Sequence, residues 1–366
     1  MRQVLIKDKC LHFGSCGGCT AQHLSAPAYS AWKEGQVAQI LQKYDLKGCI
    51  EPIIKCPLYS RRRIELIAHK NKHGLKVGFN IYRTHEIIDI MECHIVLPQI
   101  LHNIDVVKNM AALIDNQQEV FRINLLWTEE GLDVTFKEVG NLSQKRKDLL
   151  IQYAIENNIA RLNLGAESLV EQRKPYIKFG DVAVYIAPAS FVQAVEAIEK
   201  KMVELAIEHL KKCKSVIDLF AGSGSFTFPL LKYMSVHAVE FEKSSLRAMI
   251  DAYSKQNYKL KPLTTEQRNL FNMPLTAKEL NNFDAIIFDP PRAGANAQCR
   301  EIVKSNVTKI VAVSCNADSL AQDLKILQDG GYNIDKIIPV DQFLWSPHCE
   351  IVAFLSKKKK KQGWKL

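Results

Sequence analysis

From about residue 180 onward, short hydrophobic segments rich in β-branched residues alternate with amphipathic helical segments, and this alternation constrains the fold more than any other feature. Continuous apolar strands that alternate with helices are typical of a parallel sheet covered by helices on both faces. We therefore predict an α/β fold with a doubly wound sheet over residues 181–356. The expected elements are a long helix over 192–213 and strands over 215–220, 235–241, 285–288 and 309–313.

The N-terminal part follows a different pattern, in which short segments alternate between polar and apolar side chains as antiparallel strands do. We predict a separate α+β domain over residues 1–180 and a basic tail over residues 357–366. The expected elements of the N-terminal domain are a helix over 28–44, strands over 62–68, 75–80 and 85–91, and a helical segment over 98–114.

The chain of 366 residues carries 49 Lys and Arg residues against 39 Asp and Glu residues, a formal net charge of +10. The segment from Lys55 to His85 holds eight Lys and Arg residues and one acidic residue, with Tyr59, Phe79 and Tyr82 among them. Basic side chains beside aromatic rings are typical of a surface that binds a polyanion, although a solvated strand face has the same composition.

No apolar stretch reaches the roughly 18–20 residues that a membrane span needs. The N-terminus is mixed in charge, unlike a secretory signal peptide. The ten cysteines are therefore expected to be reduced, and clustered ones to bind a metal or take part in catalysis. We expect a cytoplasmic protein without a membrane segment, and no obligate protein partner is evident.

A glycine-rich turn follows the first expected strand of the α/β domain. The strand contains Asp218 and leads into a turn where Gly222 and Gly224 let the backbone bend sharply and approach a ligand. Glu240, at the end of the next strand, can accept hydrogen bonds from a ribose diol. Thr227 stands in place of the third glycine of the dinucleotide fingerprint, so the turn suits S-adenosylmethionine better than a dinucleotide. An ordinary α/β turn without a ligand is the alternative.

Two further strands end in residues that carry chemistry. Asp289 follows one strand, and Pro290 and Pro291 stiffen the loop beyond it at the carboxyl edge of the sheet. Cys315 follows the next strand and places a thiol on the same edge, although a cysteine at a strand end is usually inert packing. Glu350 precedes the last apolar strand and is a candidate base if it folds back to that edge.

Taken together, these residues resemble the RNA 5-methyluridine methyltransferases. The resemblance implies a Rossmann-like methyltransferase domain, RNA as substrate and S-adenosylmethionine as methyl donor. It rests on motifs that occur in the order of the family: Phe191-Val192-Gln193, Asp218 to Phe226, Asp289-Pro290-Pro291-Arg292, Ser314-Cys315-Asn316 and His348-Cys349-Glu350.

By matching position, the resemblance makes Cys315 the nucleophile that adds to C6 of uracil and Glu350 the base that removes the C5 proton. Two departures affect donor contacts rather than the reaction: Val195 stands where the family usually has Asn, and Asn269 where it commonly has Asp. The donor contacts that the resemblance implies are Gln193, Phe220, Ser225, Glu240 and Asp289.

A cluster of cysteines near the N-terminus resembles that of the iron–sulfur members of this family. Four thiolates suit a [4Fe–4S] cluster and also zinc, and the spacing does not separate the two, although the resemblance favours iron–sulfur. We interpret the site as a staple for the N-terminal domain. The expected ligands are Cys10, Cys16, Cys19 and Cys93, with Cys49 and Cys56 as rival fourth ligands.

Many members of the family carry a small β-barrel RNA-binding domain, the TRAM domain, before the cysteines. Nine residues precede Cys10 here, so we expect this domain to be missing. RNA is usually read through unstacked single-stranded loops. Candidates for gripping it are the three arginines Arg61 to Arg63 and the lysine run 357–361.

The resulting hypothesis is an S-adenosylmethionine-dependent RNA uracil-C5 methyltransferase that acts on 23S ribosomal RNA, because the transfer-RNA-specific bacterial members lack the cysteine cluster. A uridine in the T-loop of transfer RNA is the close alternative. A non-catalytic RNA-binding or folding factor is an alternative of another class. A methyltransferase for amino groups would need neither Cys315 nor Glu350.

Overall fold

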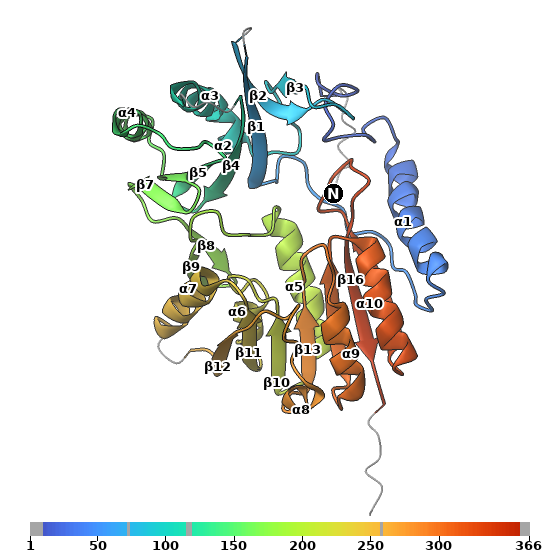
Figure 1. The fold of residues 1–366 in the computed structure, drawn as a ribbon. Coiled ribbons are helices and arrows are strands. Elements are labelled where there is room, and N and C mark those ends of the chain that lie inside the picture. Colours follow the sequence, from blue (N-terminus) through green and yellow to red (C-terminus); the bar gives the residue numbers. More distant parts are fainter. Residues whose placement is uncertain (1–9, 72–73, 115–118, 257–258, 359–366) are drawn as a thin grey trace, which may run out of the picture.

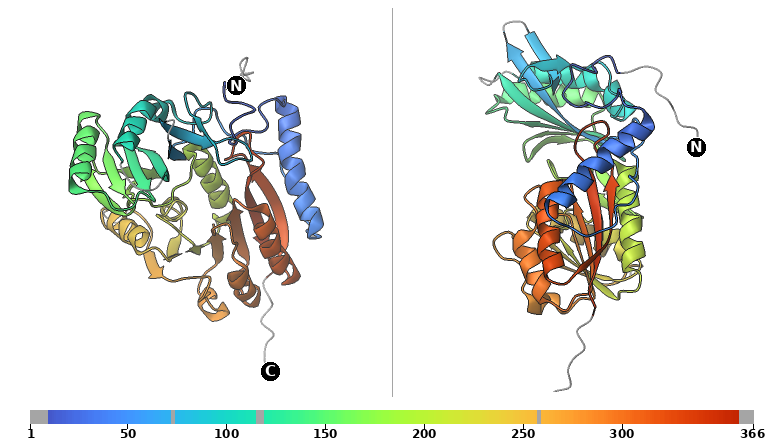
Figure 2. Two further views of the ribbon diagram at one scale, coloured as in Figure 1. Left: turned by 45° about the horizontal axis from the view of Figure 1, so that its top comes forward. Right: turned by 90° about the vertical axis from the view of Figure 1, so that its right-hand side faces the viewer.

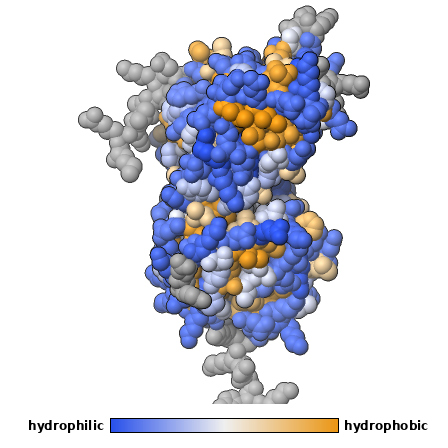
Figure 3. Space-filling model, turned by 90° about the vertical axis from the view of Figure 1, so that its left-hand side faces the viewer, coloured by the Kyte–Doolittle hydropathy of each residue, from blue (hydrophilic) through white to orange (hydrophobic). Residues whose placement is uncertain are grey.

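The computed structural model describes residues 10–71, 74–114, 119–256 and 259–358, and it contains two seven-stranded sheets, one above the other (Figure 1). Within these residues no helix combines the length and the apolar character needed to cross a membrane. On the side of α4 (Gln144–Glu156) and α7 (Lys243–Ser254), the molecule is narrower between the two sheets than at either sheet (Figure 3). Apolar residues are exposed on this side in both halves of the molecule.

The second sheet is the α/β sheet that the sequence predicts. Its order is β12-β11-β10-β13-β14-β16-β15. The first five of these strands pair in parallel, whereas β16 is antiparallel to both β14 and β15. The bounds are β10 (Ser215–Leu219), β11 (Ser235–Glu240), β12 (Leu263–Gln267), β13 (Ala285–Phe288), β14 (Lys309–Ser314), β15 (Asn333–Val340) and β16 (Glu350–Ser356).

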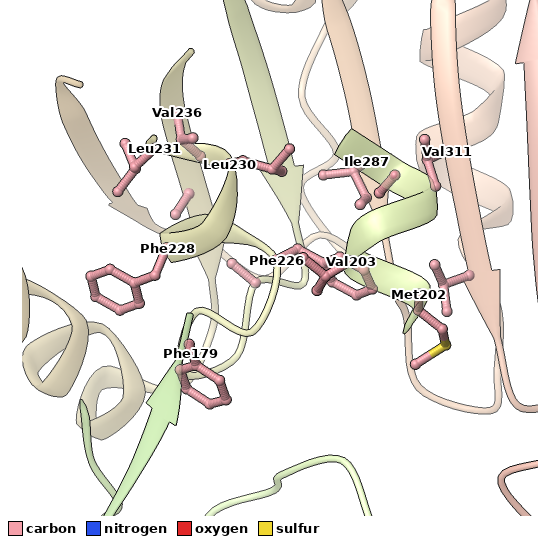
Figure 4. Close-up of a cluster of buried hydrophobic side chains, with 14 of the residues drawn as sticks. Phe179, Met202, Val203, Phe226, Phe228, Leu230, Leu231, Val236, Ile287 and Val311 are labelled. Atoms are coloured by element: carbon pink, nitrogen blue, oxygen red, sulfur yellow. The ribbon is translucent and has the colours of Figure 1, made fainter. Parts of the chain in front are cut away.

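Helices cover both faces of this sheet, which confirms the doubly wound prediction (Figure 2). Because side chains alternate along a strand, Ile287 of β13 packs into the cluster of Figure 4, whereas Ile286 and Phe288 pack on the opposite face. One face is covered by α5 (Glu196–Leu210), α6 (Thr227–Leu230) and α7, the other by α8 (Ala277–Leu280), α9 (Asn296–Lys304) and α10 (Ala317–Asp329).

The first sheet has the order β3-β2-β1-β4-β5-β6-β7 and is antiparallel except where β5 pairs with β6. Helices α2 (Pro98–His102), α3 (Ile104–Leu113) and α4 share its core, so this part is α+β as predicted. The strands are β1 (Arg63–Asn71), β2 (Gly74–Asn80), β3 (Ile87–Asp89), β4 (Val120–Thr128), β5 (Gly131–Lys137), β6 (Arg161–Leu164) and β7 (Glu167–Glu171).

Two segments of the first 190 residues belong to the core of the second sheet. Helix α1 (Ala26–Lys43) packs against α10 and β15 through Val37 and Leu41. The hairpin of β8 (Tyr176–Phe179) and β9 (Val182–Tyr185) packs against α7. A boundary at residue 180 would therefore fall in the turn of this hairpin, and the chain crosses between the two sheets more than once.

Candidate active site

The predicted residues meet at one edge of the second sheet because of the strand directions. β13 and β14 are parallel, so Asp289 and Cys315, which follow them, lie at the same edge. β16 runs in the opposite direction, and its first residue, Glu350, therefore lies at this edge too. β15 is antiparallel to β16, so the chain leaves β15 here as well, just before Gln342.

The glycine-rich turn after β10 has the backbone that a close approach to a ligand requires. Phe220 and Gly224 both have positive φ angles, 60° and 99°. A Cβ at Gly224 would come within 2.8 Å of the Phe228 ring, so space as well as backbone demands glycine there. The Phe220 ring contacts Phe271 with centroids 5.5 Å apart, and Ser225 is half-buried in the turn. Two of the five predicted contacts to the methyl donor, Phe220 and Ser225, thus lie on this turn.

Glu240 anchors the same turn from the end of β11. Its Oε2 accepts a hydrogen bond from the Gly222 N–H (2.8 Å), and its Oε1 accepts from the N–H groups of Phe241 (2.7 Å) and Glu242 (2.8 Å). These bonds use three of the roughly four acceptor sites of the carboxylate, so Oε2 keeps one for a hydroxyl group of a ribose. The hydrogen bonds fix where that hydroxyl group would lie.

The loop that carries Cys315 is joined to the loop after β13. Asn316 caps α10, because its Oδ1 accepts from the N–H groups of Asp318 (3.1 Å) and Ser319 (3.4 Å). Its Nδ2 donates to the carbonyl oxygen of Arg292 (3.0 Å). The half-buried thiol is therefore held on a capped helix start beside the Asp-Pro-Pro-Arg segment.

Two buried glutamines, which we call the glutamine bridge, connect the carboxylates of Asp289 and Glu350. Gln193 Nε2 donates to Asp289 Oδ2 (2.8 Å). Gln342 Nε2 donates both to Gln193 Oε1 (2.8 Å) and to Glu350 Oε2 (2.8 Å). Gln342 Oε1 is buried and has no hydrogen-bond partner among the described residues. Such an acceptor costs about 1–3 kcal/mol, so stability alone does not explain Gln342.

The carboxyl groups at the two ends of the bridge hold protons more tightly than usual. Burial raises the pKa of Glu350 to about 8, and the negative charge of Asp289 adds to the effect. Burial likewise raises the pKa of Asp289 to about 7. The pKa of Cys315 is raised to about 11 by burial and by both carboxylates, against the opposing charge of Arg292. A carboxylate with a pKa near neutrality is suited to take up a proton during a reaction.

The loop between β15 and Glu350 is fixed by α1. The fully buried Lys33 places its Nζ 2.8 Å from Asp341 Oδ1 and donates to the carbonyl oxygens of Phe343 (3.0 Å) and His348. Tyr29 donates its hydroxyl to Asp341 Oδ2 (2.8 Å). A buried pair that is hydrogen-bonded on all sides holds a loop in one conformation, and here that loop delivers Glu350.

The arginine segment has a different role from the predicted one at its central residue. Arg62 is buried, its Nη2 lies 3.1 Å from Glu199 Oε2, and its Nε donates to the carbonyl oxygen of Gln193 (3.1 Å). The prediction that Arg62 grips RNA is therefore wrong, because a buried guanidinium paired with a carboxylate does not reach a partner. Arg62 supports the segment that carries Gln193 instead.

The flanking arginines stack on aromatic rings beside this edge. The Arg63 guanidinium lies 4.5 Å from the centroid of the exposed Phe191 ring, and that of Arg61 lies 5.7 Å from the Phe343 ring. Both remain candidates for an RNA contact. Of the lysine run, residues 359–361 lie outside the described part of the chain.

The four predicted cluster cysteines line one small pocket at the end of the first sheet, with apolar walls that include Phe79, Ile88 and Ile90. Within the described ranges, however, no group of three or more His, Cys, Asp or Glu side chains is arranged so that it could hold a metal ion. The rival Cys49 and Cys56 lie away from this pocket, beside β15 and at Ser60. The pocket is lined by Cys10, Cys16, Cys19 and Cys93.

The cysteine segment contacts the loop before Glu350. Thr20 and Ala21, which directly follow Cys19, donate their N–H groups to the carbonyl oxygen of Trp345 (2.8 and 3.1 Å). Two backbone hydrogen bonds to one carbonyl group thus connect the cysteine segment to the loop that leads to Glu350.

Sequence reasoning missed Gln342 and the Lys33–Asp341 pair. Gln342 follows soon after a buried strand, and the same pattern of a polar residue after a buried strand identified Asp289 and Cys315. That pattern was not used for Gln342 because the direction of β15 depends on its pairing with β16, which the hydrophobic pattern does not show. Lys33 has no local signal, since it occupies an ordinary helical position.

Comparison with known proteins places this arrangement in a family. The family model of tRNA (uracil-5-)-methyltransferases matches residues 113–358. An uncharacterized RNA methyltransferase of Mesorhizobium japonicum is 43% identical over 358 residues, which cover 98% of this chain and 86% of the relative. A 23S rRNA (uracil(1939)-C(5))-methyltransferase of Marinomonas sp. is 28% identical over 371 residues, with coverage of 97% and 82%.

The fold agrees with this result. The crystal structure of Pyrococcus abyssi tRNA (uracil-54, C5)-methyltransferase in complex with S-adenosyl-L-homocysteine superposes with a TM-score of 0.73, covering 93% of this chain and 84% of that chain at 24% identity. The chain therefore belongs to the tRNA (uracil-5-)-methyltransferase family and is an S-adenosylmethionine-dependent RNA (uracil-5-)-methyltransferase.

Proposed function

We propose that this enzyme methylates C5 of a uridine through a covalent bond between the Cys315 sulfur and C6 of the base. The observation that carries the proposal is the meeting of a thiol, a buried carboxyl group of raised pKa and the glycine-rich turn at one edge of the second sheet. Methylation of an amino group needs neither the thiol nor the carboxylate. A binding factor without activity needs none of the three.

The chemistry requires a nucleophile because C5 of uracil reacts poorly with a methyl sulfonium. The Cys315 thiolate adds to C6, and the electron pair of the C5–C6 double bond becomes an enolate. C5 then takes the methyl group, and the electron pair of the broken C–S bond stays with S-adenosylhomocysteine. Glu350 takes the C5 proton, the C5–C6 double bond re-forms, and the S–C6 bond breaks to return the thiolate.

The charges of the site set the order in which these groups become active. With a pKa near 11, Cys315 is a thiol in the free protein at neutral pH. A sulfonium cation bound beside Asp289 would offset the two carboxylates that raise this pKa. The target base must also leave its stack to reach the thiol. A bound donor would therefore lower the pKa of the thiol so that its proton passes to solvent water, and the flipped base would then meet the thiolate.

The donor contacts are proposed on the same geometry. Glu240 would accept from a ribose hydroxyl, the tilted rings of Phe220 and Phe271 would offer apolar surface to adenine, and Asp289 would supply a negative charge near the sulfonium. Ser225 and Gln193 complete the predicted set on the turn and on the glutamine bridge.

A transcript that contains 5-fluorouridine tests the reaction, because fluorine at C5 cannot leave as a proton. We expect a protein–RNA adduct that survives a denaturing gel in the presence of S-adenosylmethionine and is absent from Cys315→Ala. Cys213→Ala is the matched control, since Cys213 precedes β10 and lies at the opposite edge of the sheet. Tight RNA binding without any adduct would contradict the covalent mechanism.

We propose 23S ribosomal RNA as the substrate, with the T-loop of transfer RNA as the alternative. Support comes from the relative in Marinomonas, which is named for a 23S rRNA uridine, and from the cysteine pocket. Ribosomal and transfer RNA fragments with 5-fluorouridine, compared in parallel, rank the two. Faster trapping by the transfer RNA fragment would contradict the ribosomal assignment.

We further propose that the cysteine pocket holds a [4Fe–4S] cluster with a structural role. Four thiols from two segments line one pocket with apolar walls, a donor set that suits a [4Fe–4S] cluster or zinc, and the resemblance of the cysteine segment favours the cluster. When bound, the cluster would cross-link the N-terminal segment to Cys93. Absorption spectroscopy and iron analysis of protein purified without oxygen test this, and stoichiometric zinc without iron would contradict it.

A further inference from the structure

We propose that Gln342 is a positioning residue: it orients the Glu350 carboxylate for proton removal and fixes the amide of Gln193 toward Asp289. This inference rests on the proposed function, because it assigns Glu350 the role of base. It concerns a residue to which neither the sequence motifs nor the family resemblance gave a role.

The hydrogen bonds allow only one orientation of the Gln342 amide. Its NH₂ group has two hydrogens, and two acceptors, Gln193 Oε1 and Glu350 Oε2, each lie 2.8 Å from Nε2. The reversed amide would set a carbonyl oxygen against both acceptors. Since Gln193 must accept through Oε1, its own NH₂ group is the part that faces Asp289 Oδ2. One amide thus sets the direction of the whole glutamine bridge.

This direction distinguishes the two oxygens of Glu350. Oε2 receives the Gln342 hydrogen bond, whereas no donor among the described residues reaches Oε1. A proton on Oε2 would compete with that hydrogen bond. Oε1 is therefore the atom left to take the proton from C5, and a fixed Oε2 keeps Oε1 in place.

Several charged or titratable groups face the Glu350 carboxylate. Asp289 approaches from the loop after β13 and Cys315 from the loop after β14, with Arg292 near the thiol. On the other side of the start of β16, Lys33 and Asp341 lie around Cys349, where their charges oppose each other. The Gln342 hydrogen bond favours the ionised form of Glu350 in a site where burial and Asp289 oppose it.

Gln342→Met tests the inference, because it keeps the length of the side chain and removes the donor. We expect kcat to fall about 10- to 100-fold with little change in kcat/KM for S-adenosylmethionine, since the slowed step follows methyl transfer. The acid limb of the kcat–pH profile should move to higher pH by about one unit. An adduct that carries the labelled methyl group should accumulate on ordinary uridine RNA.

Gln298→Met is the matched control. Gln298 is also buried and makes two hydrogen bonds, to the N–H (2.8 Å) and the carbonyl oxygen (3.0 Å) of Leu275, away from the candidate site. This variant should lose stability without a shifted pH profile or a trapped adduct. A second variant, Gln342→Asn, keeps the amide but is too short to reach both acceptors, and it should behave as Gln342→Met does.

The outcomes separate this inference from the proposed function. If the unmodified enzyme forms no 5-fluorouridine adduct, the proposed function fails. If it forms that adduct while folded Gln342→Met and Gln342→Asn show the unmodified kcat, pH profile and product release, only the role of Gln342 is contradicted. Adduct accumulation in both Gln342 variants, and not in Gln298→Met, would support the inference.

Discussion

Two clusters of buried polar side chains, one in each sheet, differ in how their carboxylates are paired. In the first sheet, the fully buried Arg161 donates from Nε and Nη2 to the two oxygens of Asp133 (2.9 and 2.7 Å), and Asn163 donates to Asp133 Oδ1 (2.8 Å). The remaining guanidinium nitrogen donates to the Tyr185 hydroxyl (2.8 Å). We call these residues the arginine cluster. Its carboxylate has a cation, and its donors have acceptors.

The glutamine bridge, in contrast, joins the carboxylates of Asp289 and Glu350 only through neutral amides. It leaves Gln342 Oε1 without a partner among the described residues, and burial raises the pKa of both Asp289 and Glu350 although the amide hydrogen bonds lower it. Selection for stability alone would produce the first arrangement, because buried charges need partners. The second arrangement is explained by chemistry, which needs a carboxylate ready to accept a proton. Substitutions in the arginine cluster should therefore lower stability and leave activity unchanged, whereas substitutions at the glutamine bridge and its carboxylates should lower activity more than stability.

The largest effect is expected for Glu350→Gln. Loss of the base should slow turnover at least 100-fold, since general base catalysis typically contributes 10²–10⁴-fold. Because the substitution also removes a buried carboxylate, the melting temperature should rise or stay unchanged. Methyl transfer from labelled S-adenosylmethionine and thermal unfolding measure the two effects. A variant that keeps a tenth of the activity would argue against Glu350 as the base.

Arg161→Met should show the reverse signature. It leaves Asp133 as a buried carboxylate without its cation, which typically costs about 3–5 kcal/mol of unfolding free energy. The cluster joins β5, β6 and β9 and lies outside the candidate site, so the kcat of the folded fraction should be unchanged. Denaturant unfolding gives the first quantity. Arg161→Met combined with Asp133→Leu should recover part of the loss, and failure to do so would show that packing rather than charge dominates.

The pH dependence of stability tests the raised pKa values at the two ends of the glutamine bridge. Asp289 and Glu350 have folded pKa values of about 7 and about 8, above the ordinary carboxyl values of about 4. Between about pH 4 and pH 8 these two groups therefore bind more protons in the folded protein than in the unfolded chain, and their contribution to the free energy of unfolding falls as pH rises.

Urea unfolding from about pH 5 to about pH 8 measures this slope. The fall should be smaller in Glu350→Gln, which lacks one of the two groups. Arg161→Met should lower stability while leaving the contribution of Asp289 and Glu350 in place. An equal slope in the unmodified enzyme and in Glu350→Gln would mean that the Glu350 pKa is not raised by folding.

How much of this could be read from the sequence depends on whether local pattern or long-range pairing decides the position. Asp289 and Cys315 could be placed at one edge because parallel strands end at the same side of a sheet. Glu350 could not, since its position depends on β16 running against β14. Gln342 depends on a further pairing, that of β15 with β16.

The local sequence pattern also does not indicate which residue of a charged run is buried. Three consecutive arginines look alike in the sequence, yet Arg62 is buried against Glu199 of α5 while Arg61 and Arg63 stack on aromatic rings. The partner that distinguishes Arg62 lies more than a hundred residues away. The packing of α1 against the second sheet could not be predicted either, because an apolar stripe on a helix does not indicate which of two cores the helix packs against.

The smallest effect, and the sharpest test of the comparison, is expected for Tyr185→Phe. The Tyr185 hydroxyl accepts from Arg161 Nη1 (2.8 Å) and donates to Glu171 Oε2 (3.1 Å), and Glu171 also lies 3.6 Å from Nη1. Removing the hydroxyl leaves that guanidinium nitrogen with the nearby carboxylate, so the loss should be about 1 kcal/mol with no change in kcat. Gln342→Met removes hydrogen bonds of similar length but should alter kcat and its pH profile. If the two variants instead matched in both stability and activity, the distinction between a structural and a catalytic polar group would not hold for this fold.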